Sequence, residues 1–313
     1  MGFAAFLILI FHFYVPVTGS LAEQLFYRTS YIGVDLFFFV SACSAGQKEK
    51  ISFRPFIKNR LCSVYSPFLV MTLISAIYNK WMWKKILKVV TGAELFMKSG
   101  GAFMWFIPGI MIFYLITPLL VQLKSRYGWK TFAGMTFFWA LLVGILQYGF
   151  HYTKLFILLN RIPVFAVGLF YDGLRKALPR KIRLPMIVTG LVSGIFMMHK
   201  WGSFVRLGKP VEEMFYVVAV PLVITIAALF DYISQRTKVR NLPLMFMGSI
   251  SLELYGLQMI FGYDIETFFL EKTGNGFLSF VCMTVVLTGL SFIFYRVRKA
   301  IIPKLLKKEI TEK

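Results

Sequence analysis

The chain has 313 residues, of which 58% are hydrophobic and 16% are charged, and its formal net charge is +21. A soluble domain is roughly 45–50% apolar and about 25% charged, so this composition excludes an ordinary soluble protein and predicts one that lies in lipid. Nucleic acid is excluded as the partner of this charge, because the basic residues lie in short loops between apolar runs, where they set topology and contact anionic membrane lipid.

The hydropathy pattern predicts an all-α fold: a polytopic transmembrane bundle of about ten spans that forms one domain over residues 1–313. A helix needs about 20 apolar residues to cross the hydrocarbon. The predicted spans are 2–18, 31–47, 61–78, 102–121, 129–150, 155–172, 184–199, 213–233, 243–263 and 276–297. Most Lys and Arg residues then fall on the side of the two termini, including the basic tail 298–313, which predicts that both termini are cytoplasmic.

One outer loop is unusually basic. Lys80, Lys84 and Lys88 recur every four residues, the spacing of one helix face, and Trp81 and Trp83 are residues that favour the headgroup level. We expect a helix here that lies on the outer leaflet. The alternative is that one span is miscounted.

Polar side chains from several spans recur at one depth. His12 in the first span and Asp35 in the second lie roughly 6–8 Å below the outer surface, at a rise of 1.5 Å per residue. A charge at the bilayer centre costs ~2.5–3.5 kcal/mol on insertion scales, so such residues should face a polar cavity, which we expect to open to the outside. The residues of later spans assigned to the same cavity are Trp105, Asn160, Arg161, Glu253, Tyr255 and Gln258.

A histidine beside a carboxylate suits general-base catalysis. Neutral imidazole accepts a proton near pH 7, and a carboxylate bonded to one ring nitrogen fixes its tautomer. We therefore predict that His12 takes a proton from a hydroxyl, that Asp35 orients His12, and that Arg161 stabilises an oxyanion. The structural alternative is that His12 only bonds a neighbouring helix and that Asp35 pairs with Arg161.

The inner mouth of the third predicted span is basic. Lys58 and Arg60 lie there and suit a phosphorylated donor. Loops on the cytoplasmic side are basic in many membrane proteins, so these two residues can also act on topology alone. The cysteines, Cys43, Cys62 and Cys282, have no metal-binding spacing, and we predict no metal site.

At these residues the chain resembles acyltransferase family 3, the ten-span integral membrane acyltransferases. The matching stretches are LILIFHF, YIGVDLFFFVSA, FRPFIKNRLCSVYSP, FMWFIPGIMIFYLITPLL, NRIPVFAVGLF and GSISLELYGLQ, which cover nearly the whole chain. The resemblance implies transfer of an acyl group, usually acetyl from cytoplasmic acetyl-CoA, to a hydroxyl of an extracytoplasmic glycan or lipid-linked acceptor at the plasma membrane. It implies that His12 is the base, and it matches Asp35 and Arg60 to an acidic and a basic motif position.

Three positions depart from the family pattern. The family places arginines at the positions of Met1 and Ser63, and often a histidine at the position of Gln258. The Gln258 amide can form hydrogen bonds but cannot carry a proton.

A rival interpretation is a transporter or exporter of a polar or acylated small molecule that uses the same cavity without chemistry. Broken helices and inverted repeats would favour it. The sequence has prolines within spans, at Pro108, Pro163 and Pro221, but no matching halves.

Overall fold

The structure, a computed structural model, describes residues 1–13, 30–98, 101–152, 154–177, 185, 188–190, 192, 215–236 and 242–311. Within these ranges the regular structure is helical and includes no strand, which confirms the all-α prediction. The helices are α1 (Gly2–Phe11), α3 (Ile32–Gly46), α4 (Phe53–Arg60), η1 (Leu61–Tyr65), α5 (Ser66–Tyr78), α6 (Trp83–Val90), α7 (Ala93–Lys98), α8 (Phe106–Tyr127), α9 (Trp129–Gly144), η3 (Ile145–Gly149), α10 (Phe156–Leu159), α11 (Ile162–Ala177), α13 (Phe215–Arg236), α14 (Leu242–Ser249), α15 (Ser251–Thr273) and α16 (Gly276–Thr311).

The helices account for a multi-pass membrane protein. In the described part of the chain, five are long and apolar enough to cross a membrane: Phe53–Tyr78, Phe106–Tyr127, Trp129–Gly149, Phe156–Lys176 and Gly276–Ala300. A sixth candidate is α14 with α15, which meet at a 64° bend. The helices α1, α3 and Ala219–Ile233 are apolar but shorter. The expected span 184–199 lies mostly outside the described residues, so ten spans with cytoplasmic termini stay a prediction.

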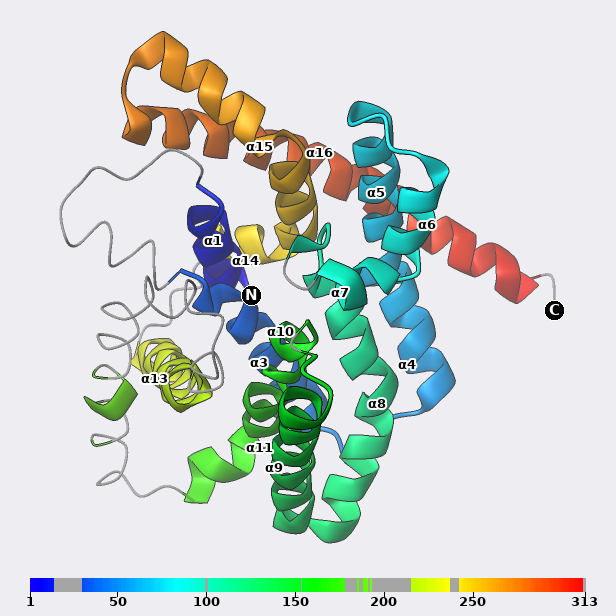
Figure 1. Cartoon of the computed structure of the whole chain (residues 1–313), viewed down its shortest axis with the longest axis vertical. Coiled ribbons are helices and arrows are strands. Elements are labelled where there is room, and N and C mark those ends of the chain that lie inside the picture. The colour runs from blue at the N-terminus through cyan, green and yellow to red at the C-terminus, as the bar shows by residue number, and fades with distance from the viewer. Residues whose placement is uncertain are drawn as a thin grey trace.

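The surface of the bundle is apolar where lipid would contact it. Ile77 of α5, Phe137 of α9 and Val285 of α16 are 80%, 70% and 66% exposed. In water such faces would associate, whereas hydrocarbon solvates them. Figure 1 shows α15 and α16 running side by side as a long hairpin at one edge of the bundle.

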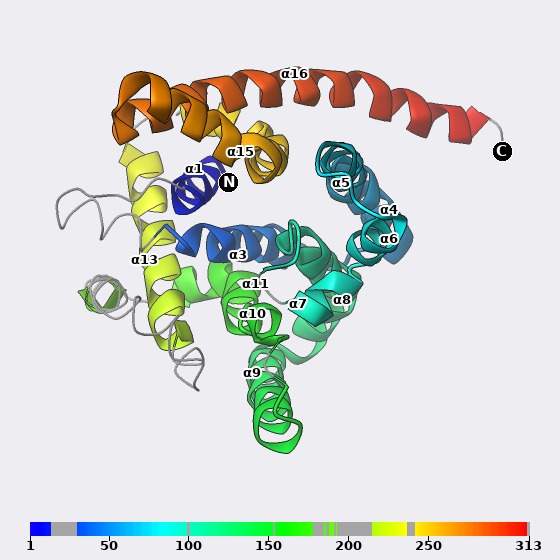
Figure 2. The same ribbon diagram turned by 45° about the horizontal axis from the view of Figure 1, so that its top comes forward.

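Helix α3 forms the centre of the bundle. Figure 2 shows it between α1 and α11, and it packs against both. The contact with α11 is close because small residues line it. A Cβ atom at Gly168 would lie 2.5 Å from the Phe39 carbonyl oxygen, and one at Gly46 would lie 2.1 Å from the Leu169 carbonyl oxygen. Small residues allow such backbone approach between membrane helices.

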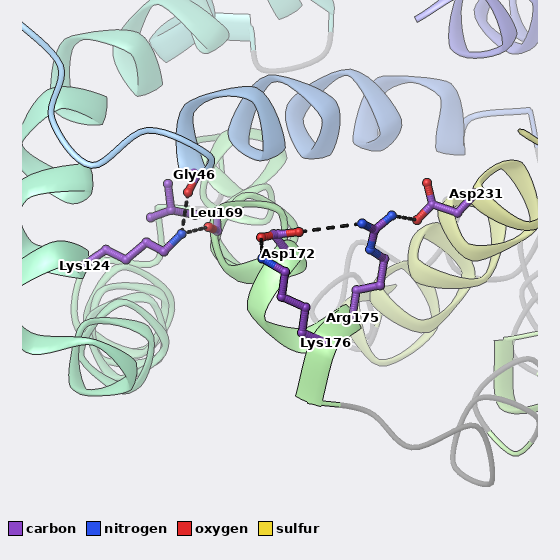
Figure 3. A network of polar contacts seen from close by, with 7 residues as sticks. All are labelled: Gly46, Lys124, Leu169, Asp172, Arg175, Lys176 and Asp231. Carbon is purple, nitrogen blue, oxygen red and sulfur yellow. Dashed lines mark hydrogen bonds and ion pairs between the residues drawn. The ribbon is translucent and has the colours of Figure 1, made fainter. Parts of the chain in front are cut away.

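One lysine joins three helices at the end of α3. Lys124 of α8 donates from Nζ to the carbonyl oxygens of Gly46, at 2.6 Å, and Leu169, at 2.8 Å (Figure 3). The Gly46 carbonyl belongs to the last turn of α3, where carbonyl groups have no partner within the helix. Lys124 therefore caps α3 and fixes it against α8 and α11.

An ion-pair network extends from the same region. Arg175 of α11 contacts Asp231 of α13 at 3.1 Å and Asp172 at 3.8 Å, and Lys176 contacts Asp172 at 2.7 Å (Figure 3). These side chains are partly exposed, so solvent and salt screen each pair and its contribution to stability is small. The network links α11 to α13.

The basic loop contains a helix, but a shorter one than the lysine spacing predicts. Lys80 has φ 51°, a left-handed conformation that ends the α5 segment, so only Lys84 and Lys88 lie on α6. Met82 and Trp83 are 75% and 68% exposed, whereas Val89 is buried. Contact of α6 with the outer leaflet stays a prediction.

Candidate active site

Two clusters of polar groups contain most of the predicted site residues, and the first surrounds Arg161. Nε of Arg161 lies 3.2 Å from Oδ1 of Asp35, and Nη2 donates to the Tyr31 hydroxyl at 2.6 Å. The guanidinium carbon lies 5.6 Å from the centre of the Trp105 ring. Arg161 and Asp35 are 1% and 0% exposed. A fully buried guanidinium needs such partners, because an uncompensated charge there is costly.

The sequence of α3 explains why Asp35 faces α11. Gly33 packs against α1, where a Cβ atom would lie 2.7 Å from the Ala4 carbonyl oxygen. A residue two positions further along a helix points about 200° around its axis. Asp35 therefore points away from α1 and toward Arg161.

This geometry corrects the expected contact between His12 and Asp35. Among the described residues, the hydrogen-bond partner of the His12 ring is the Ile8 carbonyl oxygen, 2.9 Å from Nδ1. The Asp35 carboxylate forms its ion pair with Arg161 instead. The alternative pairing considered for the sequence is the one that the structure contains.

His12 lies at the C-terminal end of α1, at the centre of the second cluster. It is the C-cap residue and is partly buried. A tautomer with hydrogen on Nδ1 donates to Ile8 and leaves the Nε2 lone pair available, a role that a backbone carbonyl often has for histidine. The His12 and Tyr255 rings are 5.8 Å apart, centre to centre.

Gln258 fastens the end of α1 to α15. Its Nε2 donates to the Leu9 carbonyl oxygen at 2.8 Å, and the side chain is 1% exposed. Tyr255, three residues earlier, lies on the same face of α15. Gln258 and Tyr255 thus hold the segment that carries His12 from one side.

A cavity of about 250 Å³ extends from this cluster. Ile8, Tyr255 and Gln258 line it, as do Arg60, Ser63 and Arg298. From Ser251 to Gln258 the cavity follows α15, which corresponds to about 10 Å at 1.5 Å per residue. His12 itself is not among the lining residues, so the cavity joins the arginines to Tyr255, whose ring lies beside that of His12.

The two predicted donor-binding residues differ in position. Arg60 lines the cavity, and its guanidinium carbon lies 4.6 Å from the centre of the Tyr114 ring and 5.1 Å from that of Phe56. Its Nε is buried without a hydrogen-bond partner among the described residues. Lys58 is exposed, and the cavity lining does not include it.

The structure separates the predicted cavity residues. Trp105 and Asn160 are both buried near Arg161: the Trp105 ring lies against the guanidinium, and Asn160 precedes Arg161 in the chain. Neither is among the residues that line the cavity. Tyr255 and Gln258 do line it. Glu253 lies next to it, 1% exposed, with Oε1 2.5 Å from Nε of Arg298.

Arg298 is a charged residue of the cavity lining that the sequence did not indicate. It falls at the start of the predicted basic tail, but α16 continues as a helix to Thr311 and carries Arg298 back to the cavity. Arg296 and Lys299 flank it, so the sequence has no signal that separates it from its neighbours. In the part of the chain that the structure describes, no three His, Cys, Asp or Glu side chains gather as a metal site.

The chain was compared with curated proteins, with solved structures and with models of protein families. Searches against curated proteins and against solved structures give no significant match. A family model described as the acyltransferase domain, of the acyltransferase 3 type, matches residues 2–296. This match includes both polar clusters and the cavity lining except Met1 and Arg298, and it shows that the chain belongs to acyltransferase family 3.

Proposed function

We propose that the protein moves an acyl group, acetyl in the simplest case, from acyl-CoA to a hydroxyl of an extracytoplasmic glycan or glycolipid at the plasma membrane. The observation that supports this proposal is the single cavity with Arg60 at one end and the Tyr255–Gln258 face, beside His12, at the other. Guanidinium groups bind phosphates, and imidazole serves as a base near pH 7.

In the proposed reaction the base is Nε2 of His12. Nε2 accepts the proton of the acceptor hydroxyl while the hydroxyl oxygen bonds to the thioester carbonyl carbon. The carbon–sulfur bond then breaks, and the imidazolium returns the proton to the CoA thiolate. The Ile8 carbonyl, which accepts from Nδ1, holds the ring in the required tautomer.

Asp35 and Arg161 have a positioning role in this proposal. Their charges are paired with each other in a buried cluster, and the cavity lining includes neither of them. The pair fixes α3 against the start of α11, and α3 in turn packs against α1, which carries His12. Their effect on turnover is therefore transmitted through the packing of α1.

The test uses purified protein and acetyl-CoA with a labelled acetyl group. We expect thioester hydrolysis or acyl transfer that is lost, by a factor of about 100 or more, in His12→Ala. His151→Ala is the matched control, because His151 is exposed and lies after η3. Equal turnover in the His12→Ala variant would remove His12 as the base. Mass spectrometry of surface glycans from cells with and without the protein identifies the acceptor.

One observation favours transport as a second candidate. The 64° bend between α14 and α15 produces the kind of broken helix that transporters use at their binding sites. A transporter would bind the substrate tightly without turnover, and His12→Ala would leave that binding unchanged. The labelled acetyl-CoA assay therefore separates the two functions.

A further inference from the structure

The cavity has a second arginine at its Arg60 end. Arg298 lines the cavity with Arg60 and Ser63, and its side chain is 23% exposed. Nε of Arg298 donates to Glu253, and Nη1 points to the Ser63 carbonyl oxygen at 3.4 Å. Among the described residues these contacts use Nε and Nη1, so the Nη2 hydrogens can be donated to a ligand.

The charges at this end of the cavity are not balanced. Two guanidinium groups, of Arg60 and Arg298, lie beside the single carboxylate of Glu253. Arg60 lies against aromatic rings, and no ion pair joins it to an acid in the described part of the chain. No Asp or Glu is among the described residues that line the cavity. An anionic group would therefore be attracted to this end.

The start of α15 adds to this attraction. The helix begins at Ser251, directly after the bend. Its N-cap residue is Ile250, whose apolar side chain does not cap the first N–H groups of the helix. Ser249 and Ser251 line the cavity. The partial positive charge of a helix N-terminus favours anions.

We infer that Arg298 binds a phosphate group of the acyl-CoA donor, together with Arg60. This inference rests on the proposed function and deepens it. A guanidinium donates charge-assisted hydrogen bonds to phosphate oxygens, and Arg298 lines the cavity. The cavity continues from there along α15 for about 10 Å to Gln258. This shape suits a molecule with phosphates at one end and a reactive thioester at the other.

A binding measurement tests the inference directly. The protein is placed in nanodiscs of zwitterionic lipid, and the Kd for CoA is measured for the wild type, Arg60→Gln, Arg298→Gln and Arg296→Gln. We expect CoA to bind about 10- to 100-fold more weakly to Arg298→Gln, since a charge-assisted hydrogen bond to phosphate is lost. Arg296 is exposed on the same helix and does not line the cavity, so Arg296→Gln should bind like the wild type.

A second measurement separates phosphate binding from a structural role. Acetyl-pantetheine carries the same thioester as acetyl-CoA but lacks the nucleotide and its phosphates. Arg298→Gln should raise KM for acetyl-CoA and leave KM for acetyl-pantetheine and kcat near the wild-type values. If Arg298 only holds α16 in place, the variant will use both donors poorly. Arg298→Lys is the substitute variant if Arg298→Gln does not fold. It keeps the charge but loses the guanidinium geometry, and we expect it to bind CoA several-fold more weakly than the wild type.

The outcomes distinguish this inference from the proposed function. If the wild type binds CoA, Arg60→Gln weakens that binding and Arg298→Gln does not, the inference is wrong and the proposed function stands. If the wild type neither binds CoA nor cleaves acetyl-CoA, both are wrong. Selective loss of CoA binding and of acetyl-CoA use in the Arg298 variants supports the inference.

Discussion

Arg161 and Asp35 form a buried ion pair across the α3–α11 contact, with Nε 3.2 Å from Oδ1. Both side chains are excluded from solvent, and Arg161 also donates to the Tyr31 hydroxyl. The pair lies one helix away from His12, so its contribution to structure can be measured separately from the chemistry.

Breaking this pair on one side should be costly. Asp35→Leu leaves a buried guanidinium without its carboxylate, which typically costs about 3–5 kcal/mol, whereas the double variant Asp35→Leu/Arg161→Met removes both charges and should recover much of that loss. The midpoint of thermal unfolding in detergent measures both. A double variant no more stable than Asp35→Leu would contradict this expectation.

The α3–α11 contact should tolerate no side chain at Gly168. A Cβ atom there would lie 2.5 Å from the Phe39 carbonyl oxygen and 2.8 Å from Cβ of Ala42, so Gly168→Ala forces the helices apart. Overpacking of this kind costs roughly 1–3 kcal/mol. Gly173→Ala is the control on the same helix, since its nearest neighbour would be a Trp129 ring atom at 3.9 Å. The midpoint temperature of thermal unfolding should fall for Gly168→Ala and stay equal or rise for Gly173→Ala.

Gln258 should control turnover through the position of His12. Gln258→Leu leaves the Leu9 carbonyl without its donor, a loss of about 1–3 kcal/mol, and loosens the end of α1. We expect kcat to fall while KM for acetyl-CoA changes little, because Arg60 is untouched. Gln258→His supplies an N–H group and should retain more activity than Gln258→Leu. Equal kcat in both variants would contradict this role; Gln122→Leu, on an exposed position of α8, is the control.

The α6 helix should contact the lipid surface. Trp83 is 68% exposed and the preceding Met82 is 75% exposed. Lys84 and Lys88 follow on the same helix. Amphipathic helices of this kind bury their apolar side in the interface. Lipids brominated near the headgroup should quench a fluorescence component that Trp83→Phe removes. Quenching that is the same in wild type and Trp83→Phe would place α6 away from lipid.

Much of the architecture follows from composition and periodicity. Apolar runs as long as 102–121 and 276–297 have one stable solution in lipid, a helix with its backbone groups paired internally, and the structure has helices there. The stretches around His12 and Asp35 were also sufficient to indicate acyltransferase family 3, to which the chain belongs.

The partners of each polar side chain were decided only by the tertiary structure. Depth along a span is readable from residue number, since each residue adds 1.5 Å, but the direction in which a side chain points depends on which neighbour its helix packs against. Gly33 lets α1 approach one face of α3, and this turns Asp35 toward Arg161 and leaves His12 to the Ile8 carbonyl. Arg298 reaches the cavity for the same reason: the packing of α16 on α15 brings together residues that the sequence keeps 45 positions apart.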